Sequence, residues 1–104
     1  MILVLDRDDL LYLFSSVAEV ESHLEAIDIA DGEYRFCDDT GRKFVAEITS
    51  PVTRFGGGRF RLVPEGVTDA ELLSSLLARA RSLDRGCGEF QTLADLRSSL
   101  ARES

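Results

Sequence analysis

The chain has 104 residues, of which 44% are hydrophobic and 30% are charged, a balance typical of a soluble globular protein. This length suits one folding unit, so we expect residues 1–104 to form a single domain. The formal net charge of -7 disfavours nucleic acid and anionic membranes as partners, because both repel an acidic surface.

Continuous apolar runs over residues 2–5 and 10–14, separated by a charged turn, predict a first hairpin. The apolar period then changes to three and four residues, as in a helix. Ser16 and Glu19 match a capping box at the start of this segment, so we expect a helix over about 16–26.

A second hairpin is predicted from two alternating runs, 33–37 and 43–48. The segment 38–42 between them has the acids and the glycine of a short hairpin loop. Pro51 ends this ladder, and after a glycine-rich loop a last strand is expected over 59–63.

Two helices are expected in the last third of the chain. Thr68 and Glu71 match a second capping box, and a broad leucine stripe predicts a helix over about 68–83. The side chains that this helix should bury are Leu72, Leu73, Leu76 and Leu77. Thr92 is expected to cap a shorter helix, whose apolar positions are Leu93, Leu96 and Leu100.

These elements predict an α+β fold in the order ββαβββαα. Short loops favour antiparallel pairing of neighbouring strands. We therefore expect two layers, a mainly antiparallel sheet of about five strands with the helices on one face.

The location of the protein is predicted from its first residues and from its cysteines. The apolar start of the chain is much shorter than the roughly 18 residues of a membrane span, and charged residues follow it at once. We expect neither a signal peptide nor a membrane anchor. Cys37 and Cys87 lie far apart in a cysteine-poor chain, which favours the reducing cytoplasm.

No coherent catalytic or metal site emerges from the sequence. Counting from Asp6 or from Asp28 puts apolar or otherwise unsuitable residues at ligand positions of a calcium loop, so we expect no metal and no cofactor. A thiol nucleophile would need a base, and His23 is the single histidine. Its place on the rim of an apolar helix face, and that of Cys37 in an alternating strand, favour structural roles, so we expect no enzyme activity.

One alternative is an anion site in the loop at residues 56–58, where successive backbone amides could cradle a phosphate. Its candidate ligand-binding residues are Arg54, Gly57, Arg59 and Arg61. The loop lacks the lysine and hydroxyl residue of a nucleotide-binding loop, and a hairpin connection also explains it. On this alternative the chain is a small-molecule-binding or catalytic domain.

The acidic charge is concentrated in the first half, where residues 1–50 contain 12 acids and four bases. Residues 51–104 contain seven acids and eight bases. Such an uneven field attracts a basic partner to one surface and raises its association rate, although solubility alone also explains it.

The runs Glu25-Ala26-Ile27-Asp28 and Asp31-Gly32-Glu33-Tyr34, with the turn Asp38-Asp39-Thr40-Gly41-Arg42, resemble segments of small acidic bacterial immunity proteins of toxin–immunity systems. The resemblance covers about a quarter of the chain and implies non-catalytic binding to a cognate toxin. The charge pattern adds a hypothesis about the surface that would bind a basic toxin. Acids there would attract the toxin and an aromatic ring would add contact area, and the candidates are Asp31, Glu33, Tyr34, Asp38 and Asp39.

Overall fold

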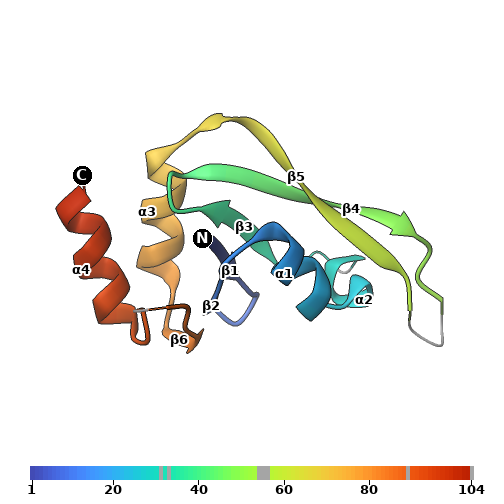
Figure 1. The fold of residues 1–104 in the computed structure, drawn as a ribbon, viewed down its shortest axis with the longest axis horizontal. Coiled ribbons are helices and arrows are strands. Elements are labelled where there is room, and N and C mark those ends of the chain that lie inside the picture. The colour runs from blue at the N-terminus through green and yellow to red at the C-terminus, as the bar shows by residue number, and fades with distance from the viewer. Residues whose placement is uncertain (31, 33, 54–56, 89, 104) are drawn as a thin grey trace.

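An open sheet of six strands organises the part of the chain that the computed structural model describes, which is residues 1–30, 32, 34–53, 57–88 and 90–103 (Figure 1). Across the sheet the strands lie in the order β5-β4-β3-β1-β2-β6. Neighbours are antiparallel except β2 and β6, which are parallel. The strands are β1 (Ile2–Leu5), β2 (Leu10–Phe14), β3 (Arg35–Asp38), β4 (Arg42–Ser50), β5 (Arg59–Thr68) and β6 (Ser82–Arg85).

Four helices complete the described elements. They are α1 (Val17–His23), α2 (Ala26–Ala30), α3 (Ala70–Arg79) and α4 (Leu93–Glu103). The α+β class and the mainly antiparallel sheet are confirmed, but the described elements follow the order ββααβββαβα. The differences from the predicted order are the additional short helix α2 and the additional strand β6.

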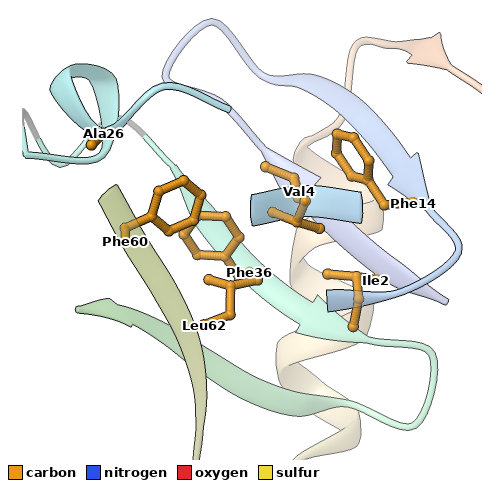
Figure 2. Close-up of a cluster of buried hydrophobic side chains, with 8 residues drawn as sticks. Ile2, Val4, Phe14, Ala26, Phe36, Phe60 and Leu62 are labelled. Atoms are coloured by element: carbon orange, nitrogen blue, oxygen red, sulfur yellow. The ribbon is translucent and has the colours of Figure 1, made fainter. Parts of the chain in front are cut away.

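The central strand β1 is buried on both faces, because alternate side chains enter two separate cores. Ile2 and Val4 belong to the first core, on the side of α1 and α2 (Figure 2). Leu3 and Leu5 belong to the second core, on the side of α3 and α4. The other buried members of the first core are Phe14, Val20, Ala26, Phe36, Phe60 and Leu62, and those of the second are Leu11, Leu13, Cys37, Leu76, Ala80 and Leu96.

The expectation of helices on one face is therefore wrong. Val20 of α1 and Ala26 of α2 lie in the first core, whereas Leu76 of α3 and Leu96 of α4 lie in the second. The physical reason lies in the apolar runs of β1 and β2. Strands without polar residues at alternate positions need cover on both faces, as in sheets between two helical layers.

The helix expected over 16–26 is divided into α1 and α2. Its predicted start is confirmed, since the Ser16 hydroxyl accepts the N–H of Glu19 at 3.2 Å. At Leu24 the backbone turns to an extended conformation, with φ -87° and ψ 149°. The carbonyl of Glu25 then accepts the first amides of α2, from Asp28 and Ile29.

The leucine-rich helix is shorter than predicted at both ends. Thr68 is the last residue of β5, and the helix cap is Asp69, whose carboxylate accepts the N–H of Glu71 at 2.9 Å. The helix ends at Arg79, because the chain becomes extended at Ala80 and continues into β6 along the edge of β2. Leu76 is fully buried and its leucine neighbours are partly buried, so the predicted apolar face is confirmed.

The strand β6 is tied to α1 through Arg85. Its guanidinium donates to a carboxylate oxygen of Glu19 at 2.6 Å and to the carbonyl of Leu13 at 3.3 Å. It also lies 4.6 Å from the ring centroid of Phe14, a favourable position for a cation. This cluster connects residues from β2, α1 and β6 that are up to 72 positions apart.

Strands β4 and β5 form the longest hairpin of the described chain, with nine and ten residues. Their neighbour β3 has only four residues. Figure 1 shows the hairpin running above β3 and past α2. The hairpin therefore continues well beyond the strand that supports it.

Candidate functional site

The sheet opens between β3 and β4. The two strands pair only at Phe36 with Phe44 and at Cys37 with Lys43, whereas β4 continues to Ser50. A groove of about 890 Å³ lies where they diverge. Unequal strand lengths thus create a concave site between two neighbouring strands of the sheet.

The groove combines an apolar surface with charged side chains. Its apolar residues include Ile29, Tyr34, Phe36, Phe44 and Ala46, and its charged residues are Arg35, Lys43, Glu65 and Asp69. The Tyr34 and Phe36 rings form a tilted pair with centroids 6.1 Å apart. Aromatic side chains with a few charged groups at the edge are typical of sites that bind proteins.

Most charged groups of the groove are already engaged. The ammonium of Lys43 lies 3.8 Å from a carboxylate oxygen of Glu65, and both side chains are more than half exposed. Such a surface pair contributes less than about 1 kcal/mol. The carboxylate of Asp69 caps α3, and exposed Arg35 makes no ion pair with a described residue. Arg35 is therefore the cation best placed to meet an incoming group.

The structure separates the predicted partner-binding residues that it describes. Tyr34 precedes β3 and lines the groove, whereas Asp38 and Asp39 lie at the other end of that strand. Asp31 and Glu33 lie outside the described residues. Of the three described candidates, only Tyr34 lines the groove.

Asp38 holds its own turn together. One of its carboxylate oxygens accepts the amides of Thr40 and Arg42, each at 2.9 Å, and the Thr40 hydroxyl at 2.6 Å. Partial burial alone would raise the pKa of Asp38, but these hydrogen bonds and the charge of Arg42 outweigh it and lower the pKa. Reversing this charge would open the turn, so Asp39 is the better position for a test of steering.

The described residues of the alternative anion site, Gly57, Arg59 and Arg61, do not line the groove. Arg61 donates to Glu47 across the hairpin at 3.0 Å, and both side chains are exposed. Arg59 is also exposed, and Gly57 has a positive φ of 77° and faces open space. Arg54 lies outside the described residues. The described part of this site therefore fits a hairpin connection whose arginine neutralises a cross-strand acid.

The histidine and the buried thiol lie on opposite sides of the sheet. Cys37 is fully buried in the second core, and burial, with the charges of Asp38 and Asp39, raises its pKa to about 12. The His23 ring packs 5.6 Å from that of Phe14, a residue of the first core. The structural roles expected for Cys37 and His23 agree with these positions.

Sequence reasoning missed the groove because it treated 33–37 and 43–48 as matched strands. A signal was present in the charges of the longer hairpin. Lys43 faces Glu65 and Glu47 faces Arg61 in the register of β4 and β5. Opposite charges on facing residues favour a strand pair, and they extend this hairpin past the end of β3.

No protein-family model matches the chain, and neither does any curated protein or solved structure. Among the described residues, no three His, Cys, Asp or Glu side chains gather as they would around a metal ion. The described helices include none that is long and apolar enough to cross a membrane. The fold and the groove therefore define the class of this protein: an α+β sheet protein with helices on both faces and an opening between β3 and β4.

Proposed function

We propose that the chain is a non-catalytic module that binds another protein through the groove between β3 and β4. The observation that supports this most is the composition of the groove, whose lining combines the aromatic residues Tyr34, Phe36 and Phe44 with exposed Arg35. Aromatic rings bury a large area at little entropic cost, and a guanidinium adds a directional contact.

Within this class, we propose a bacterial immunity protein that binds and blocks a cognate toxin. The support is the resemblance of the segment from Glu25 to Arg42, which includes Tyr34 of the groove and both aspartates of the β3–β4 turn. The cytoplasm is the proposed location, where the free thiols of Cys37 and Cys87 stay reduced.

The net charge of -7 supports a basic partner surface, but the acids act from a distance. Asp6, Asp8 and Asp9 follow β1 at one end of the sheet. Asp38 ends β3 and Asp39 follows it at the opposite end, since the two strands are antiparallel. Charges spread in this way raise the association rate more than the final affinity. The groove supplies the contact that holds the complex.

The test is association of the purified chain with the protein encoded by the neighbouring gene. Arg35→Glu should weaken the complex about tenfold or more, which equals about 1.4 kcal/mol, because it removes the guanidinium contact in the groove. It also makes the chain more acidic, so weakening separates the groove contact from the attraction of a basic partner. Tyr34→Ala should accelerate dissociation. Arg81→Glu is the matched control, since Arg81 is exposed, lies between α3 and β6, and does not line the groove.

Two results would contradict the proposal. Absence of a complex at micromolar concentrations would remove the toxin as partner. An equal effect of Arg35→Glu and Arg81→Glu on affinity would show that overall charge, not the groove, determines binding. Asp39→Lys separates the two contributions further, because it should slow association and leave dissociation unchanged.

A further inference from the structure

The outer edge of β5 is protected at two positions against the addition of a strand. A carboxylate oxygen of Glu21, in α1, accepts the N–H of Leu62 at 2.8 Å. Two positions further along the strand is Pro64, which has no N–H to offer. Backbone groups on one side of a strand recur at every second residue, so Leu62 and Pro64 face the same way. A charged cap and a proline are two of the means by which proteins protect a free edge.

The edge formed by β6 is short. This strand has four residues and pairs with β2 through Ser82, Leu83 and Arg85. A strand of this length offers few backbone groups to an added chain, which is another form of edge protection.

The edge of β4 on the side of β3 is not protected in this way. The register of β4 with β5 shows which of its backbone N–H and C=O groups point toward that side. The N–H of Leu62 points away from β4 toward Glu21, so its facing residue Ala46 also directs its backbone away from β5. The N–H of Arg42 also points to the β3 side, where it donates to the side-chain carboxylate of Asp38. This direction agrees with even-numbered residues of β4 facing β3. Ala46 and Ile48 thus present their amides and carbonyls to the side where β3 is missing.

These backbone groups meet no partner among the described residues. The pairing of β3 with β4 ends at Phe44, and no hydrogen bond to the amide or carbonyl of Ala46 or Ile48 is formed on that side. Ala46 lines the groove, and Ile48 follows it on the same strand. Ile48 is also the exposed large hydrophobic residue of the described chain, with 42% of its surface accessible.

We propose that an extended segment of the partner protein adds to β4 as a strand at Ala46 and Ile48, within the groove. This inference rests on the proposed function and deepens it. Donors and acceptors that repeat at every second residue are matched by a peptide backbone, whereas a small ligand would use only one or two of them. Side chains of the added strand that point toward Phe44 and Ile48 are apolar, because they cover that face.

The wild-type complex gives the first test, by amide hydrogen exchange with the protein encoded by the neighbouring gene as the probe. Exchange at Ala46 and Ile48 should slow about tenfold or more on binding, because their N–H groups become hydrogen-bonded. The amides of Arg61 and Val63, which already face β4, should change little.

The second test uses Ile48→Pro with Ile48→Val as its matched control. Proline at 48 removes only an N–H that faces away from β5, and the hairpin already contains Pro64 at such a position. Ile48→Pro should weaken the complex about tenfold or more, the effect of losing one buried main-chain hydrogen bond, and Ile48→Val less than about threefold. If Ile48→Pro does not fold, the exchange measurement on the wild-type complex decides alone.

The results of these tests distinguish a failure of strand addition from a failure of the proposed function. A complex that leaves exchange at Ala46 and Ile48 unchanged would overturn strand addition while the proposed function stands. Absence of a complex would overturn both. Protection of these amides without partner, increasing with protein concentration, would assign the edge to a second copy of this chain and overturn the proposal.

Discussion

Replacing Glu21 with alanine tests whether one carboxylate holds the edge of the sheet to helix α1. Glu21 lies 41 positions from Leu62, whose N–H it accepts at 2.8 Å. Leu62 is 6% exposed and belongs to the first core. Removing the carboxylate leaves this amide without its acceptor and with little access to water.

The expected loss follows from the kind of bond. A hydrogen bond to a charged group contributes about 1.5–3 kcal/mol to stability. Removing the acceptor also leaves the Leu62 N–H buried and unpaired, which carries a desolvation penalty. Alanine favours a helix slightly more than glutamate, which returns a few tenths of a kcal/mol. We therefore expect Glu21→Ala to lower the free energy of unfolding by about 2 kcal/mol and Tm by roughly 8–16 °C.

Urea denaturation followed by circular dichroism measures this loss. Glu25→Ala is the control, because it removes the same charge from an exposed position between α1 and α2 and should cost less than about 0.5 kcal/mol. Glu21→Gln should lie between them, since an amide oxygen still accepts but without the charge. Equal stability of the Glu21→Ala and Glu25→Ala variants would refute the role assigned to Glu21.

Three further predictions concern the cores and the first hairpin. Leu76→Ala should lower the free energy of unfolding by about 2–5 kcal/mol in urea, because Leu76 is fully buried, and a loss below about 1 kcal/mol would remove α3 from the second core. Cys37→Ser should cost about 1–3 kcal/mol, measured in the same way, because it puts a hydroxyl in an apolar core, and Cys37→Ala should restore part of that loss. Burial and the hydrogen bond to Asp6 raise the pKa of Tyr12 from its ordinary 10.0 to about 12. As the pH rises, the unfolded chain therefore loses the Tyr12 proton before the folded chain does, so the free energy of unfolding should fall between pH 10 and pH 12. The Tyr12→Phe variant, measured over the same pH range, should lack that fall.

The candidate site was predictable only in part. Tyr34 could be proposed from its place beside the acidic loop, and it lines the groove. Asp38 was proposed for its charge, but its hydrogen bonds to Thr40 and Arg42 give it a local structural role. An aspartate at the start of a hairpin turn commonly closes that turn, and the same residue type serves both roles. The sequence pattern alone could not separate them.

Local signals in the sequence were sufficient for several elements. Ser16 begins α1, the segment 38–42 turns the chain between β3 and β4, and Leu76 marks the buried face of α3. Each of these features depends on a few neighbouring residues, through a cap, a turn conformation or a helical repeat. Such interactions are present in any short piece of the chain, and the sequence by itself therefore determined them.

Only the tertiary structure decided which faces and edges are covered. Residues 82–85 form a strand because the edge of β2 is available to pair with them. The amide of Leu62 meets Glu21 because the folded chain brings β5 against α1. The groove exists because β3 ends while β4 continues. Each of these features depends on groups that are tens of residues apart in the sequence. Local periodicity does not specify where such groups meet, because they come together only when the two cores form.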